Sequence, residues 1–202
     1  MRKFEIILFL SLAAYLVLSG VRGFDKDYRA LQNDVVRIHI MANSDANSDQ
    51  ELKLRVRDAI LGHSSKWLEN CNDSEQAQEI INAHLGEIND IARSEIQAAG
   101  YDYDVNSQIV KMDFEDRVYG NITMPRGNYT ALRVTIGEAK GHNWWCVMYP
   151  PLCIPAAGSQ DVELEDYTQY FSDGEIKILE NCSGYEIRFK CAEIYNSIKE
   201  KI

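Results

Sequence analysis

The chain has 202 residues, of which 46% are apolar and 26% are charged, a composition typical of a globular protein that excludes a disordered or fibrous one. Its net charge of −10 repels phosphate backbones, so nucleic acid is not an expected partner. A chain of this size buries roughly 70% of its unfolded surface, so we expect one domain that needs no structural metal.

The N-terminal segment has the features of an export signal. Two basic residues, Arg2 and Lys3, precede an apolar run over residues 6–18, and small residues follow as far as Gly23. The run is shorter than the roughly 20 residues that span a bilayer, although an uncleaved anchor stays open as an alternative. We therefore expect residues 1–23 to be a signal peptide or an N-terminal membrane anchor.

The next segment indicates a strand followed by a helix. Residues 34–42 alternate apolar and polar side chains, which is the period of a half-buried strand. Turn-forming residues occupy 43–47, and Ser48 with Glu51 makes a capping box that opens an amphipathic helix. We expect this helix to end near Leu68.

Further elements follow in the middle and at the end of the chain. Apolar spacing predicts a second helix from Ser74 to Gly100, which would form a hairpin with the first. Residues 103–114 and 131–136 return to a strand period and are expected to pair as a hairpin. Its turn is expected at Pro125, Gly127 and Asn128. Residues 185–202 predict a final amphipathic helix, after an irregular segment.

Taken in this order, the elements indicate an α+β fold. Residues 34–202 are expected to form a single domain. It would contain a small, mainly antiparallel sheet, a helical hairpin and the C-terminal amphipathic helix. The order of the strands does not follow from the pattern.

Five cysteines occur in a chain that is expected to leave the reducing cytoplasm, so one of them has no internal partner. Cys146 and Cys153 flank a bend stiffened by two prolines, and a disulfide between them would contribute about 2–3 kcal/mol. We predict this disulfide. Two buried free thiols are the alternative, because free Cys is among the most buried residue types.

The segment that contains these cysteines is rich in aromatic and proline residues. Adjacent residues of an extended segment point in opposite directions, so Trp144 and Trp145 cannot both point inward. Trp and Tyr anchor many protein interfaces. The alternative is a Trp pair wedged into the edge of the core. The predicted partner-binding residues are Trp144, Trp145, Tyr149, Pro150, Pro151 and Leu152.

No enzyme motif accompanies this segment, and we predict no catalytic residue, metal ligand or cofactor. The alternative is an exported thiol- or zinc-dependent hydrolase that uses Cys146 and His142. A zinc site formed by His142, Cys146 and Cys153 lacks a local fourth ligand, and its spacing fits none of the usual structural zinc patterns.

Two blocks of sequence resemble the stage II sporulation protein R family. The first comprises VRIHIMANSD at residues 36–45, with the family motif Asn43, Ser44 and Asp45, then Asp49 and Gln50, and LKLRVRD at residues 52–58. The second comprises segments within residues 127–137, NWWCV at 143–147 and PPLC at 150–153.

The resemblance implies a signal of endospore-forming bacteria that needs no catalytic group. Such a protein is secreted from the forespore into the intermembrane space between forespore and mother cell. There it activates a membrane-embedded aspartic protease, which processes the pro-sigma-E precursor in the mother cell. Contact with membranes is then expected only through the N-terminal segment or through this receptor.

Overall fold

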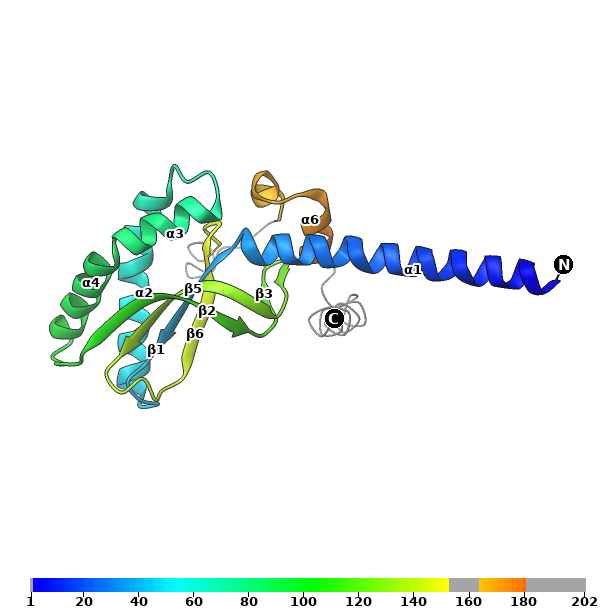
Figure 1. Cartoon of the computed structure of the whole chain (residues 1–202). Coiled ribbons are helices and arrows are strands. Elements are labelled where there is room, and N and C mark those ends of the chain that lie inside the picture. The colour runs from blue at the N-terminus through cyan, green and yellow to red at the C-terminus, as the bar shows by residue number, and fades with distance from the viewer. Residues whose placement is uncertain (1, 153–163, 181–202) are drawn as a thin grey trace.

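The structure is a computed structural model, and it describes residues 2–152 and 164–180. Four strands form one sheet in the order β2-β5-β1-β6 (Figure 1): β1 (Val36–Met41), β2 (Val105–Phe114), β5 (Gly127–Ile136) and β6 (Asn143–Tyr149). β1 and β5 are parallel, whereas β2 pairs with β5 and β6 pairs with β1 in antiparallel fashion. The sheet is therefore mixed and mainly antiparallel, which confirms the predicted α+β single domain.

Three helices lie along one face of the sheet: α2 (Asn47–Leu68), α3 (Ser74–Ala83) and α4 (Leu85–Ala98). Side chains of a strand alternate between its faces, and Val36, Ile38 and Ile40 of β1 are fully buried in the core that includes these helices. On α2, Val56 and Ile60 are also fully buried in that core. Burying a side chain of this size contributes roughly 1.5–3 kcal/mol, so this layer supplies much of the stability of the domain.

The helix predictions are right in position and wrong in two details. The capping box at Ser48 does not form, because α2 already begins at Asn47 and its N-cap, Ala46, makes no side-chain cap bond. The single helix expected up to Gly100 is broken at His84, whose backbone angles of −99° and 10° are not helical. Gly100 does end α4, with a positive φ of 85° that suits glycine.

The predicted hairpin of β2 and β5 is confirmed, but its turn is not where the sequence indicated. A small hairpin of β3 (Arg117–Tyr119) and β4 (Ile122–Met124) connects the two strands. Gly127 and Asn128 lie inside β5 instead of in the turn. Gly127 has a φ of 152°, and a Cβ at this position would collide with the side chain of Gln32. This glycine therefore permits close contact between β5 and the N-terminal helix.

The segment expected to be irregular contains β6, which is the largest error of the sequence analysis. Its seven residues, NWWCVMY, are nearly all apolar and show no alternation of polar and apolar side chains. Such a run does not distinguish a strand from other buried structure. Pro150 and Pro151 follow directly, and they predict a bend without indicating the strand before it.

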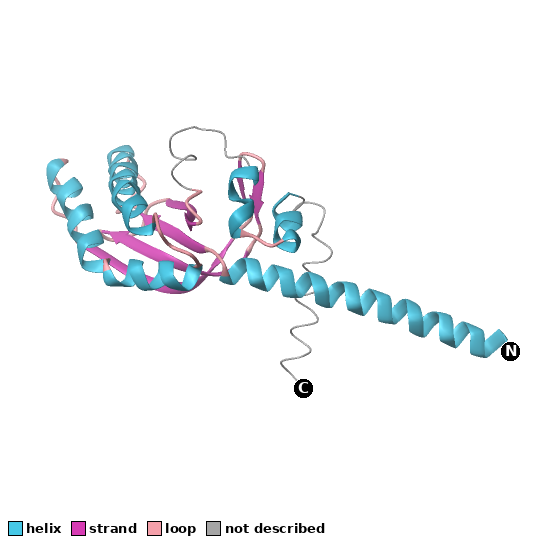
Figure 2. Cartoon of the chain, turned by 90° about the horizontal axis from the view of Figure 1, so that it is seen from above, coloured by secondary structure: helices cyan, strands magenta, loops and turns pink. Residues whose placement is uncertain are grey.

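The N-terminal helix α1 (Arg2–Asn33) extends away from the sheet (Figure 2). Its described side chains are exposed as far as Gly20, and Phe24 is the first of them to be buried. Phe24 and Leu31 join the core, and α1 contacts α6 (Asp173–Glu180), which follows the 3-10 helix η1 (Leu164–Tyr170). In residues 2–152 and 164–180, no helix meets the length and hydropathy of a membrane-spanning segment. The helix expected at residues 185–202 lies outside the described residues.

Candidate partner-binding surface

The family motif occupies the loop that follows β1. Because β1 and β5 are parallel, their following loops meet at the same end of the sheet. The backbone N–H groups of Lys140 and Gly141 donate to the carbonyls of Asn43 and Ala42 at 3.1 and 3.0 Å. A Cβ at Gly141 would collide with the carbonyl of Ser44, so the two loops require a glycine here.

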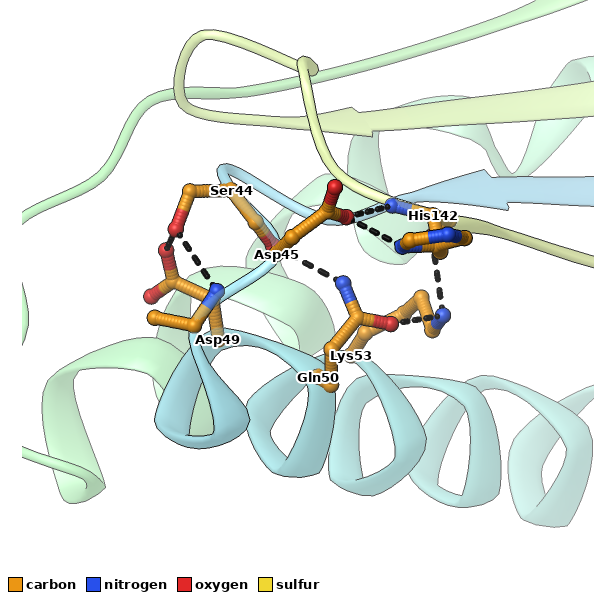
Figure 3. A network of polar contacts seen from close by, with 7 residues as sticks. Ser44, Asp45, Asp49, Gln50, Lys53 and His142 are labelled. Atoms are coloured by element: carbon orange, nitrogen blue, oxygen red, sulfur yellow. Dashed lines mark hydrogen bonds and ion pairs between the residues drawn. The ribbon is translucent and has the colours of Figure 1, made fainter.

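Asp49 ties the motif loop to the first turn of α2 (Figure 3). Its carboxylate accepts hydrogen bonds from Asn43 Nδ2 at 2.8 Å, Ser44 Oγ at 2.6 Å and Tyr103 Oη at 3.2 Å. Burial alone would raise the pKa of Asp49, but the bonds from Ser44, Asn43 and Tyr103 lower it overall. Two of the three motif residues thus hold the loop in place.

Lys53 connects the loop before β6 to α2 (Figure 3). This buried side chain donates to Gln50 Oε1 at 2.7 Å and to the carbonyl of His142 at 2.8 Å. Gln50 in turn donates to the carbonyl of Ser44 at 2.8 Å. Burial, together with the nearby charge of Arg57, lowers the pKa of the Lys53 amine. The network fixes the position from which β6 starts.

Asp45 and His142 form an exposed pair at the rim of this network. Asp45 Oδ1 accepts from the backbone N–H of His142 at 2.7 Å and also contacts its ring Nδ1. The two side chains are 58% and 78% exposed. The hydroxyl of Ser44 donates to Asp49 and not to this imidazole, so serine, histidine and aspartate are present without forming a catalytic triad.

Sequence reasoning missed most of this polar network. Asp49, Gln50 and Lys53 all lie within the first family block. The bond from Lys53 to His142 and the contact between Asp45 and His142, however, link segments more than eighty residues apart. The spacing of residues along the chain carries no information on such contacts. The only available signal was that the two family blocks contain polar residues at the ends of their predicted strands.

Trp144 and Trp145 point to opposite faces of β6, as adjacent residues of a strand must. Trp144 lies on the side of α2, where the guanidinium of Arg57 is 5.0 Å from its ring centroid. Trp145 lies on the other side and stacks on His39, with ring centroids 3.8 Å apart. Both indoles are half-buried, so each supports the core and also reaches the surface.

The rest of the predicted partner-binding segment is more buried. Tyr149, Pro150 and Leu152 are buried, whereas Pro151 is half-buried and lines an open groove of about 250 Å³. The groove lies between the C-terminal half of α2 and the end of β6. Its lining residues are Leu61, Ser64, Ser65, Leu68, Glu69, Met148, Pro151 and Tyr170.

The thiol and zinc alternatives gain no geometric support. Cys146 is fully buried in β6 and forms no disulfide with another described cysteine. It is four residues from His142, about 13 Å along a strand, so the thiol and the imidazole do not meet. Cys153 lies outside the described residues, and its disulfide with Cys146 stays a prediction. In the described part of the chain, no group of three or more His, Cys, Asp or Glu side chains could hold a metal ion.

Comparison with known proteins agrees with the two sequence blocks. The family model for stage II sporulation protein R matches residues 32–158. Stage II sporulation protein R of Bacillus subtilis (strain 168) is 34% identical over 149 residues, which cover 69% of this chain and 66% of the relative. The match thus spans just under two thirds of the relative's length. No solved structure matches the chain. The chain belongs to the stage II sporulation protein R family.

Proposed function

We propose that this protein is a secreted sporulation signal that acts by binding and not by catalysis. In this proposal it is exported from the forespore into the intermembrane space, where it activates a membrane-embedded aspartic protease. The protease then processes the pro-sigma-E precursor in the mother cell. Membership of the sporulation family is the observation that carries the proposal.

Three structural features support this role. Among residues 2–152 and 164–180, no nucleophile is bonded to the exposed pair of Asp45 and His142, and Cys146 is buried away from that imidazole. Trp144 and Trp145 lie half-exposed on an apolar strand, where they could anchor an interface. A basic, apolar N-terminal segment precedes Phe24, the first buried residue among those whose burial is described, as an export signal requires.

Activation by binding has a thermodynamic condition. A ligand shifts a protease toward its active form only if it binds that form more tightly than the inactive one. A shift from 1% to 99% active protease needs about 10⁴-fold preference for the active form. The recognition surface must therefore contact a part of the protease that differs between the two forms.

The test is reconstitution in non-sporulating bacteria. The full chain is co-expressed with the membrane protease and a tagged pro-sigma-E, and cleavage of the precursor is followed on blots. A matched strain expresses the same chain without residues 1–23, which removes export. We expect cleavage only with the exported chain.

The two negative results have different meanings. Cleavage that is equal with and without the export segment would show that the protein acts from the cytoplasm. Cleavage that does not depend on the protein at all would overturn the proposed function.

A further inference from the structure

β6 forms an edge of the sheet, and no other described strand pairs with it besides β1. An edge strand presents unpaired backbone N–H and C=O groups, which natural proteins usually protect with charges, prolines or bulges. The sequence of β6, NWWCVMY, contains neither a charge nor a proline. Its register with β1 is regular from Asn143 to Val147 and shifts by one residue only before Tyr149, at the end of the strand.

The opposite edge of the same sheet is protected. β2 carries the exposed charges of Lys111 and Asp113 along its length. On β6, two described side chains donate to strand carbonyls, and both bonds are long: the hydroxyl of Tyr119 to Trp145 at 3.4 Å and Nε of Arg37 to Cys146 at 3.5 Å. The two edges therefore differ in chemistry, and only β6 is suited to receive another strand.

The groove beside β6 adds a site for a side chain. Its volume of about 250 Å³ is below the range of pockets for drug-sized molecules and suits one or two side chains of a peptide. Leu61 and Leu68 of α2 form one wall, and Met148 with Pro151 forms the other. A helix beside an edge strand is an arrangement in which a peptide can add a strand and place alternate side chains in the groove.

We propose that β6 receives an extended segment of the membrane partner as a fifth strand, with an aliphatic side chain of that segment in the groove. Backbone hydrogen bonds to β6 supply affinity, and the groove selects the side chain. Trp144 and Trp145 then flank the added strand on its two faces.

Charge identifies the occupant as another protein and not a second copy of this chain. Each chain carries a net charge of −10, so pairing two copies through β6 brings two strongly acidic domains together. Glu69, at the end of α2, is exposed in the groove and makes no ion pair within the described residues. The segment that binds is therefore expected to carry a basic residue that faces Glu69, next to the aliphatic side chain in the groove.

This inference rests on the proposed function, because the membrane protease is the partner. The test combines two measurements on the full chain: precursor cleavage in the reconstituted cells, and hydrogen exchange of the β6 amides with and without the detergent-solubilised protease. Ser65→Trp fills the groove, and Lys66→Trp on the exposed side of α2 is its control. Glu69→Lys reverses the charge in the groove, and Glu51→Lys on the same helix is its control.

We expect the protease to slow exchange of the outward-facing β6 amides, and Ser65→Trp and Glu69→Lys to reduce the cleavage rate about tenfold or more. The two control variants should retain the normal rate. Far-ultraviolet circular dichroism verifies that each variant is folded, and Glu69→Lys, at an exposed position, tests the groove even if Ser65→Trp does not fold.

Several results would overturn the inference. Normal cleavage by both groove variants together with unprotected β6 amides would exclude this surface while the proposed function stands. The β6 amides could also be protected from exchange in the chain alone and lose that protection in a variant truncated after Glu180. This result would identify the chain's own C-terminal segment as the occupant. Protection that increases with the concentration of the chain alone would identify a second copy. Cleavage that does not depend on the protein would remove both the proposed function and the protease as partner.

Discussion

His39 of β1 and Trp145 of β6 lie face to face across the sheet, with ring centroids 3.8 Å apart and ring planes within 2° of parallel. Burial lowers the pKa of His39, a hydrogen bond with Asn143 opposes this effect, and the charge of Arg133 adds to it. The imidazole is therefore neutral near pH 7. Phe114 packs edge-on against Trp145, with ring centroids 4.8 Å apart. The orientation of Trp145 is thus set by its neighbours before any partner binds.

Replacement of both tryptophans tests their proposed role in recognition. The double variant Trp144→Ala with Trp145→Ala should be secreted but should fail to trigger precursor cleavage, because the strand loses both aromatic anchors. Secreted protein and precursor cleavage are measured in the same cells. The control is Leu54→Ala, which removes an exposed apolar side chain from the outer face of α2. Full activity of a folded, secreted double variant would exclude the tryptophans from the interface.

Removal of the thiols separates a binding protein from a thiol enzyme. Cys146→Ala with Cys153→Ala should retain precursor cleavage, because the buried Cys146 thiol contacts no described base. We expect a loss of about 1 kcal/mol in the free energy of unfolding from the small cavity at position 146. Precursor cleavage and urea unfolding are the measurements. A stable double variant without activity would favour thiol chemistry or an essential disulfide.

Patterns of local sequence predicted most of the fold. The strand period of β1 and β2 and the helical spacing of α2 gave each element within a few residues. β6 was missed because a continuous apolar run has no period, and only its pairing with β1 determines its structure. The break at His84 was missed because the apolar spacing continues through it.

The candidate site was less predictable than the fold. The adjacent tryptophans could be placed on opposite faces of a strand because that alternation is local. The burial of Tyr149 and Leu152, by contrast, depends on the helices and on η1, which are distant in sequence. The groove beside β6 likewise combines residues of α2, β6 and η1, and no spacing within one segment reveals it.

The carboxylate of Asp49 should be a main determinant of stability at the end of β1. Asp49→Ala leaves the donors of Asn43, Ser44 and Tyr103 without their acceptor, and we expect a loss of about 2–3 kcal/mol in the free energy of unfolding. The control is Asp58→Ala, at an exposed position of α2, where the change should stay within about 0.5 kcal/mol. Urea unfolding at pH 7 measures both.

The lowered pKa of Asp49 also gives a pH dependence. A carboxyl group with a lower pKa in the folded state stabilises the protein above its unfolded pKa, and this contribution is lost as the pH falls through the folded pKa. The stability difference between the wild-type protein and Asp49→Ala should therefore shrink below pH 4. A difference that stays constant down to pH 3 would show that the loss comes from packing and not from the carboxylate.

Asp34 gives a pH dependence of opposite sign. It lies between α1 and β1, where burial raises its pKa from 3.8 to about 6, with further contributions from the charge and hydrogen bonding of Glu175 and from the charge of Asp73. Glu175 is itself buried, and its Oε2 accepts from the backbone N–H and hydroxyl of Ser172, both at 2.7 Å. Between about pH 4 and pH 6 the folded protein holds a proton on Asp34 that the unfolded chain has lost.

Stability from this group is therefore present below pH 4 and falls as the pH rises to about 6. Asp34→Asn removes the charge that is repelled above pH 6, so it should raise the free energy of unfolding at pH 7. Since Asp34 is exposed to solvent, screening limits the expected gain to about 1 kcal/mol or less. At pH 4 the gain should disappear, because the wild-type side chain is then protonated.

Urea unfolding of both proteins from pH 4 to pH 8 measures this difference, and Asp90→Asn on the exposed face of α4 is the control. Parallel stability curves for the wild-type protein and Asp34→Asn would show that Asp34 ionises normally in the folded state. Curves that diverge as the pH rises from 4 to 6 would instead establish the carboxyl group as a point where α1, β1 and α6 are held together less tightly as the pH rises.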